Sequence, residues 1–246
     1  MAMARLIWKE WREQRWRIGF GCVILCAFAL IGLRTRAVDD QSILIGTCAI
    51  GVLLLPILAA AGLVPAERDE GTLRMLLAMP VKPWKVLAAK TLLGAALCAV
   101  PLMAAAIVSV AVARGREVSI PATLAIYGGS IATALLLFVW MLAFTARSEG
   151  EGRAAGLAVG VLVFWLMATY GLLNVVQREE SRISHLPHPA PSTRAELLLA
   201  PTPFVAVFAA DGIALATGMA VQLGIAAGLW FWAAHAVAAH ESEGRP

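Results

Sequence analysis

Few residues of this sequence have the types and spacing that chemistry requires. His185 and His188 stand three apart in the segment SHLPHPAP, a spacing that could ligate a metal ion. The prolines favour an extended segment and no third ligand is evident nearby, so we interpret it as a solvated loop and predict no metal site. Neither a Ser/His/Asp arrangement nor an HExxH motif occurs. The sequence therefore disfavours a hydrolase within the membrane.

Two polar residues, Asp211 and Gln222, lie in or near the last long apolar stretch. Ionisable residues inside a membrane span are candidates for function, so these two are our candidates for a pathway through the membrane. Asp211, however, follows APTPFVAVFAA, which could be a re-entrant or interfacial element. In that case its carboxylate would simply be hydrated.

All the cysteines fall inside apolar segments: Cys22, Cys26, Cys48 and Cys98. A disulfide framework or a zinc site would place them in loops, beside other ligands. We therefore interpret them as small packing residues.

The composition is that of an integral membrane protein. Hydrophobic residues make up 60% of the chain and charged residues only 15%, whereas soluble domains carry about a quarter charged residues. No polar block is long enough to form a soluble domain, so we expect residues 1–246 to form a single transmembrane domain. The pI of about 9.1 could indicate nucleic-acid binding. The basic residues lie between apolar runs rather than in one patch, which points instead to membrane orientation.

Six apolar runs approach the length of about 20 residues that a spanning helix needs. They lie at 18–33, 43–64, 86–113, 122–144, 154–176 and 213–238. The first run is short, and no small-residue cleavage site follows it, so we interpret it as an uncleaved span. The predicted fold class is an all-α polytopic membrane protein with six transmembrane helices.

Lysine and arginine predict the orientation of these spans. With the N-terminus inside, the inner segments hold thirteen of the 20 basic residues and all four lysines. Both termini are therefore predicted to be cytoplasmic. The two longest connections are then a cytoplasmic loop at 65–85 and an extracytoplasmic loop at 177–203.

Two Gly-xxx-Gly pairs, Gly156–Gly160 and Gly224–Gly228, lie in the fifth and sixth spans. Such pairs allow helices to approach closely in lipid. We interpret them as helix-packing residues, with dimerisation through the fifth span as an alternative.

The segment ARLIWKEWREQRWR, residues 4–17, precedes the first span. On a helical wheel the apolar side gathers Met3, Ile7, Trp8, Trp11 and Ile18, and the opposite side gathers Lys9, Arg12, Glu13 and Arg17. Tryptophans beside arginines suit a helix that lies in the headgroup layer. We predict an interfacial amphipathic helix with Trp8, Trp11, Arg12 and Trp16 at the interface; a basic flank that only orients the first span is the alternative.

The cytoplasmic stretch ERDEGTLRMLLAMP is predicted to form a short helix. Thr72 can cap its start, Pro80 ends it, and Pro83 stands near the start of the next helix. Leu73, Leu76 and Leu77 share one face. This face would either fold back onto the membrane surface or dock into a groove of a partner.

The string E-R-D-E-G-T-L-x-x-L-L-x-x-P, followed by W-K-V-x-x-x-K, covers residues 67–90 and resembles the first cytoplasmic loop of type-2 ATP-binding-cassette (ABC) transporter permeases. The six spans and the N-terminal helix fit the same architecture. The resemblance implies that Thr72 to Met79 form the coupling helix, which sits in a cleft of the ATP-binding subunit. The residues it assigns to coupling are Glu67, Asp69, Glu70, Gly71, Thr72, Leu73, Leu76, Leu77 and Pro80.

The resemblance also places Lys90 near the inner end of the third span and makes residues 4–17 the family's connecting helix. One departure is visible, because the first span is short and could begin inside the tryptophan-rich segment.

The sequence contains no G-x-x-x-x-G-K-[ST] phosphate loop. We therefore expect a transport subunit that is not itself an enzyme and binds no cofactor, with ATP and Mg on a separately encoded ATPase subunit. Six spans are half of the twelve that such exporters have, which implies a second copy of the chain or a sister permease. The expected location is a cell membrane, the bacterial inner membrane in particular.

Three functional hypotheses follow. The first is a permease subunit that couples ATP hydrolysis by the separate subunit to export of a substrate that the apolar spans do not identify. The second is a maturation or mechanotransmission subunit that acts on an extracytoplasmic partner through 177–203, as in metalloenzyme maturation. The third is a membrane enzyme or scaffold that needs no ATPase.

Overall fold

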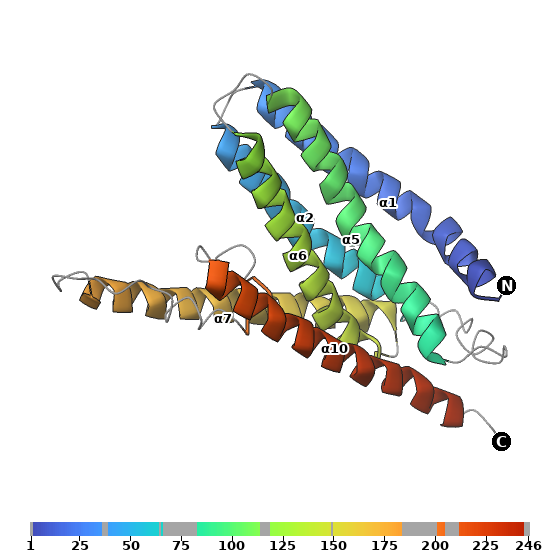
Figure 1. Cartoon of the computed structure of the whole chain (residues 1–246). Coiled ribbons are helices and arrows are strands. Elements are labelled where there is room, and N and C mark those ends of the chain that lie inside the picture. The colour runs from blue at the N-terminus through green and yellow to red at the C-terminus, as the bar shows by residue number, and fades with distance from the viewer. Residues whose placement is uncertain are drawn as a thin grey trace.

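The computed structural model describes residues 2–35, 39–63, 65, 83–113, 119–148, 150–183, 201–204 and 212–243. All regular secondary structure in these residues is helical, and Figure 1 shows the arrangement. The helices are α1 (Ala2–Thr35), α2 (Asp40–Leu63), α5 (Pro83–Ala113), α6 (Ile120–Thr145), α7 (Glu151–Ile183) and α10 (Gly212–Glu243). Six helices are long and apolar enough to cross a membrane, which confirms the predicted fold class.

Two helix ends differ from the sequence-based expectation. α1 is one unbroken helix, so residues 4–17 are helical and continue directly into the first span. α7 runs to Ile183, so the first seven residues of the predicted loop at 177–203 are helical. Pro83 is the first residue of α5, as predicted, because proline suits the first turn of a helix, where its missing N–H is not needed.

Short polar side chains define the starts of α2 and α6. The Ser119 hydroxyl accepts a hydrogen bond from the backbone amide of Ala122, and Pro121 follows in the first turn of α6. Asp39 accepts a hydrogen bond from the backbone amide of Ser42 at 2.9 Å. Hydrogen bonds from Ser42 lower the pKa of the Asp39 carboxyl. Both side chains satisfy backbone donors that a helix start leaves without an intrahelical partner.

The two termini lie toward the same side of the molecule (Figure 1). The end of α2 and the start of α5 lie toward that side as well. We call this side the terminal end of the bundle. The arrangement agrees with an even number of spans.

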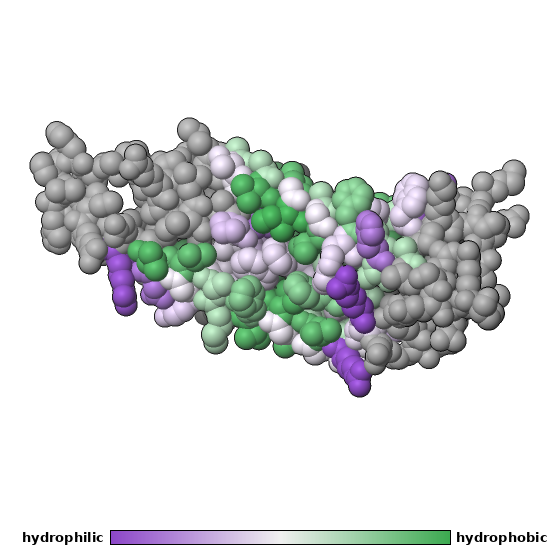
Figure 2. Space-filling view, turned by 90° about the horizontal axis from the view of Figure 1, so that it is seen from below, coloured by the Kyte–Doolittle hydropathy of each residue, from purple (hydrophilic) through white to green (hydrophobic). Residues whose placement is uncertain are grey.

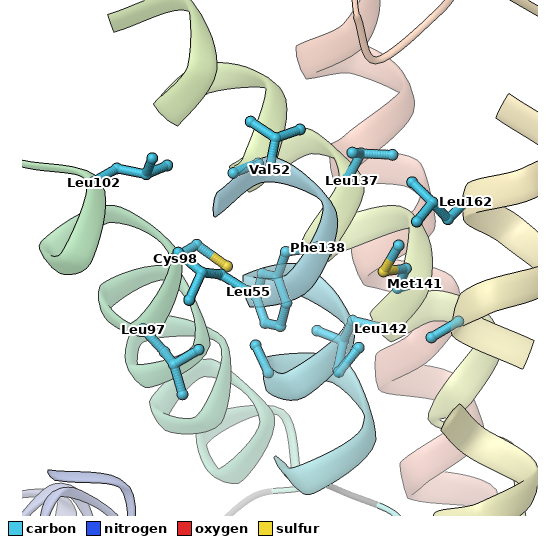
Figure 3. Packing of buried hydrophobic residues seen from close by; sticks show 14 of the residues in the cluster. Val52, Leu55, Leu97, Cys98, Leu102, Leu137, Phe138, Met141, Leu142 and Leu162 are labelled. Carbon is cyan, nitrogen blue, oxygen red and sulfur yellow. The ribbon is translucent and has the colours of Figure 1, made fainter. Parts of the chain in front are cut away.

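The core lies among α1, α2, α5 and α6, where α1 packs along α5 and α2 packs along α6 (Figure 1). In Figure 3, Phe138 of α6 and Leu55 of α2 lie opposite Leu97 and Cys98 of α5. All four side chains are at most 4% exposed. Cys48 and Cys98 are buried and all four cysteines are free thiols, which agrees with their interpretation as packing residues.

Glycines allow these four helices to approach one another closely. A Cβ atom at Gly21 of α1 would lie 3.1 Å from the Pro101 ring of α5, and one at Gly51 of α2 would lie 2.6 Å from Leu102. A Cβ atom at Gly94 would overlap the Phe138 ring. A larger residue at Gly94 would require the Phe138 ring to move, and one at Gly21 or Gly51 would require the neighbouring side chains to give way.

α7 and α10 lie across one side of this four-helix unit (Figure 1). Only 11% of the spanning stretch of α10 and 22% of that of α7 are buried, compared with 28% for α1 and 56% for α2. Figure 2 shows this side of the molecule from below, with hydrophobic residues over its middle and strongly hydrophilic residues toward both ends. This pattern is typical of a surface that faces lipid between two polar layers.

The Gly-xxx-Gly pairs do not pack helices within the chain. Among the described residues, no atom lies within 4 Å of a Cβ placed at Gly156, Gly160, Gly224 or Gly228. The prediction that these glycines serve helix packing is therefore wrong for a single chain, because both pairs lie on open faces of α7 and α10. Dimerisation through the fifth span stays a prediction.

Candidate functional site

The predicted coupling residues lie outside the part of the chain that the structure describes. They are Glu67, Asp69, Glu70, Gly71, Thr72, Leu73, Leu76, Leu77 and Pro80. The structure does describe the two helix ends that flank them, Leu63 in α2 and Pro83 in α5. The candidate site is therefore built from these flanking ends and from the helix that contacts them.

A buried ion pair joins α1 to α5 at the terminal end. Lys90 Nζ lies 3.1 Å from Glu10 Oε1, and the two side chains are only 2% and 1% exposed. Charges removed from water in this way are costly unless they are paired and hydrogen-bonded. The pairing of these two residues, 80 positions apart, therefore fixes the position of α1 against α5.

The same ammonium group also contacts α2. Lys90 Nζ donates a hydrogen bond of 2.7 Å to the backbone carbonyl of Leu63, the last residue of α2. The final carbonyls of a helix have no partner within the helix, so this contact satisfies one of them. We call the contacts among Glu10, Lys90 and the Leu63 carbonyl the Lys90 junction.

Close packing supports the junction. A Cβ atom at Gly62 would overlap the Arg17 guanidinium of α1. The Leu63 side chain lies against Gly94, one turn of α5 beyond Lys90. On α6, the Thr145 hydroxyl donates a hydrogen bond of 3.3 Å to the carbonyl of Ala60 in α2. The last turn of α2 is therefore held by α1, α5 and α6.

The inward-facing polar residues of α1, Glu10 and Gln14, were not predicted from the sequence. Its buried face follows the positions Glu10, Gln14, Ile18, Gly21, Leu25, Ala29 and Leu33. The helical wheel placed Trp8, Trp11 and Ile18 on one face, but Trp8 and Trp11 are 68% and 41% exposed whereas Ile18 is buried. Extending the buried stripe from Ile18 toward the N-terminus in steps of four reaches Gln14 and Glu10, and this signal could have identified them.

The predicted interface residues remain on the surface. Trp8, Trp11, Arg12 and Trp16 are all exposed, and the Arg15 guanidinium lies 5.6 Å from the centre of a Trp16 ring. Trp84, which is 49% exposed, has Lys85 at a similar distance near the start of α5. Exposed tryptophans beside cations suit the boundary between lipid and water. A location of residues 4–17 in the headgroup layer stays a prediction.

Gln222 is a buried helix contact. It is 0% exposed, and its Oε1 accepts a hydrogen bond of 3.4 Å from the Trp140 indole of α6. Two more aromatic residues attach α10 to the four-helix unit. Trp230 donates to the Thr91 hydroxyl at 3.0 Å, and the Arg147 guanidinium lies 3.7 Å from a Trp232 ring. The structure thus gives Gln222 a role in holding α10, whereas Asp211 lies outside the described residues.

A second buried polar contact lies farther along the core. The hydroxyl groups of Ser109 in α5 and Tyr127 in α6 are 2.9 Å apart, and both residues are at most 1% exposed. A shallow pocket of about 270 Å³ near the same end is lined by Ala106, Ile107, Val110, Ala111 and Leu124. These apolar side chains offer no polar group that would select a hydrophilic ligand.

The described residues contain no group of three metal-ligating side chains. His185 and His188 lie outside that part of the chain. His235 is an exposed residue of α10 whose Nδ1 lies 2.9 Å from the Phe231 carbonyl of the same helix.

Comparison with protein families identifies one match. The model of the family described as "ABC-2 family transporter protein" matches residues 26–194, which is more than half of the chain. The match includes the end of α2, the start of α5 and the intervening segment, but it begins after Glu10. A comparison with curated proteins found no match.

Proposed function

The chain belongs to the ABC-2 transporter family, and on that premise we propose that it couples ATP hydrolysis by a separate subunit to export of a substrate. Membership makes the chain a multi-pass membrane protein and the permease component of an ABC transporter, and it implies an ATPase partner. The family's membrane subunit has no nucleotide-binding domain of its own. ATP and Mg would therefore bind to the partner.

The Lys90 junction is the observation that carries this proposal. Residues 64–82 connect α2 to α5, and Lys90 bonds to the last carbonyl of α2 from the second turn of α5. A segment that receives force from a partner needs firm attachments at both ends, because loose attachments would absorb the movement. The buried ion pair with Glu10 adds the first span to these attachments.

The docking face would be the leucines at 73, 76 and 77, with Glu67, Asp69 and Glu70 beside them. This face would lie in the cytoplasm, together with both termini. Trp8, Trp11 and Trp16 would then lie at the inner membrane surface, where exposed indole rings are favoured. The bacterial inner membrane is the location that fits an exporter of this kind.

The substrate path would run between two permease halves, because six spans are half of a complete exporter. A second copy of the chain or a sister permease would supply the other half.

Copurification with an ATPase tests the proposal. The wild-type chain, purified from native membranes, should bring down a protein with a phosphate loop. The double variant Glu70→Lys with Leu76→Asp should separate ATP hydrolysis from transport. Glu151→Lys, a charge reversal on an exposed residue at the start of α7, is the matched control and should leave coupling intact. A double variant that couples like the wild type would show that the docking assignment is wrong.

A second candidate function is action on an extracytoplasmic partner. It is favoured by α7, which runs to Ile183 and so continues as a helix into the first seven residues of the segment 177–203. Deletion of residues 181–194 should abolish the function of a maturation subunit and leave export of a small molecule largely intact. Survival of all measured activity after this deletion would exclude the second candidate.

A further inference from the structure

The Lys90 ammonium brings three helices together at one atom. It bonds to the Glu10 carboxylate of α1 at 3.1 Å and to the Leu63 carbonyl of α2 at 2.7 Å, and it belongs to α5 itself. Leu63 is the last residue of α2, and Lys90 lies seven residues after Pro83, the first residue of α5. The two ends that flank residues 64–82 therefore meet at the contact that holds α1.

Burial makes this contact stiff. Both charged side chains are at most 2% exposed, so water does not screen their attraction and cannot easily replace either partner. The Lys9–Glu13 pair on the same helix differs in this respect. Its atoms are 3.6 Å apart, its side chains are 40% and 50% exposed, and an exposed pair of this kind holds a helix only weakly.

α1 is suited to carry a displacement away from the junction. It is 34 residues long, about 50 Å at 1.5 Å per residue, and it contains no proline, whereas α2 contains Pro56 and α5 contains Pro101. Its buried face contacts neighbours along its length. Gly21 lies against Pro101, and a Cβ atom at Gly32 would be 2.7 Å from Ile43 at the far end of the bundle.

We propose that Lys90 is a positioning residue for energy coupling, which holds α1 to both ends of the 64–82 segment so that the three move as one body. This inference rests on the proposed function, because it assumes that an ATPase moves that segment. It goes further because it names the contacts through which movement of that segment reaches the first span. The first span is driven through a buried ion pair, and its far end, beside Ile43, moves with it.

Two distances measured by spin labels on the full complex test this proposal. A chain without its native cysteines would be assembled with the ATPase in nanodiscs. One label pair replaces the exposed Trp16 and Trp84, and spans the junction. The other replaces the exposed Phe20 of α1 and Leu124 of α6, and reports movement of α1. Addition of ATP and vanadate should change the 20–124 distance and leave the 16–84 distance unchanged.

The variants remove the junction in two ways. Lys90→Met leaves a buried carboxylate and could prevent folding, so the decisive variant is Glu10→Leu with Lys90→Met, which replaces both charges by apolar groups of similar size. In that variant ATP and vanadate should no longer change the 20–124 distance, and they should now change the 16–84 distance. ATP hydrolysis should persist.

Two variants serve as matched controls. Gln14→Leu alters a 6%-exposed polar residue one turn from Glu10 on the same face of α1, and Lys85→Met removes an exposed lysine from the first turn of α5. Both should keep the wild-type pattern of distances, because neither side chain belongs to the junction.

The outcomes separate the two proposals. Failure of any ATPase to join the wild-type chain would overturn the proposed function before a variant is compared. A wild-type complex that hydrolyses ATP but changes its 16–84 distance would overturn the positioning role alone. A wild-type pattern in the double variant would do the same.

Discussion

The four helices α1, α2, α5 and α6 contain glycines packed closely against neighbouring helices, whereas the Gly-xxx-Gly glycines of α7 and α10 are not packed in this way. In the four-helix unit, Gly51 and Gly94 lie where neighbouring side chains leave no room for a Cβ atom. In α7 and α10, Gly156 and Gly224 have open space around them within the described structure. Lipid does not drive apolar helices together, so close backbone approach and polar contacts hold a membrane bundle. The first unit has both, whereas α10 depends mainly on a few aromatic contacts.

A glycine pattern alone therefore does not locate a helix interface. The two Gly-xxx-Gly pairs were the recognisable motifs, yet both lie in the open region. The glycines that do bring helices together form no such motif. Each faces bulky side chains from two other helices, as Gly94 faces Phe138 of α6 and Leu63 of α2. Open glycine faces in α7 and α10 leave room for lipid or a second chain.

The largest effect is expected from breaking the Lys90 junction of the packed region. Lys90→Met should lower the free energy of unfolding by about 3–5 kcal/mol, because it leaves the Glu10 carboxylate buried without its cation. Reversible unfolding in mixed micelles would measure this change. Adding Glu10→Leu should recover much of the loss, since the uncompensated charge is then gone.

Glu13→Gln is the control for that measurement. It breaks a pair on the same helix whose side chains are 40% and 50% exposed, and an exposed pair is worth about 0–1 kcal/mol. Equal losses for Lys90→Met and Glu13→Gln would contradict the burial of the junction.

Replacement of a glycine by alanine should lower the free energy of unfolding in the four-helix unit and leave it unchanged or raise it in α7. Gly94→Ala places a methyl group against Phe138 and should cost about 1–3 kcal/mol. Gly156→Ala meets open space and should be neutral or stabilise α7 by up to about 1 kcal/mol, because alanine favours helix more than glycine does. The same unfolding assay compares the two.

A loss of stability for Gly156→Ala as large as that for Gly94→Ala would contradict this difference between the two regions. It would show that the open face of α7 is covered in the membrane by another chain. Repeating the assay at several protein concentrations would then reveal a stability that rises with concentration.

The smallest effect is expected at the attachment of α10. Trp140→Phe keeps an aromatic ring and removes the hydrogen bond to Gln222. Hydrogen bonds between membrane helices contribute about 0.6 kcal/mol on average, so a loss of that size is expected. Trp140→Phe should also raise the reactivity of a cysteine introduced at the buried Ala233 of α10, and unchanged reactivity would show that the bond does not hold α10 in place.

Much of the fold could be predicted from the sequence, because length and hydropathy decide whether a helix spans a membrane. The six runs correspond to the six helices, and the position of Pro83 correctly marked the start of α5. α1 was harder, because residues 4–17 were predicted to form an interfacial helix ahead of the run at 18–33. One helix continues through both stretches, since Arg15 and Arg17 lie on the exposed side and Gln14 and Ile18 continue the buried stripe.

The Lys90 junction could be predicted only in part. Lys90 stood out as a lysine inside an apolar run, and a buried charge requires a partner. The sequence offered several carboxylates near that end, and the choice of Glu10 depends on how α1 and α5 pack against each other. A contact between residues 80 positions apart is set by tertiary packing, and local patterns do not contain it.

The four-helix unit is synthesised before α7 and α10. α1, α2, α5 and α6 are the first four helices and end at Thr145, so the junction, the close glycine contacts and most of the core are encoded before α7 begins. A ribosome that reaches Glu151 has already synthesised every helix of that unit. The unit can therefore assemble first, and α7 and then α10 can pack onto it. Trp140 of the unit then forms its hydrogen bond with Gln222, which follows 82 residues later in the chain.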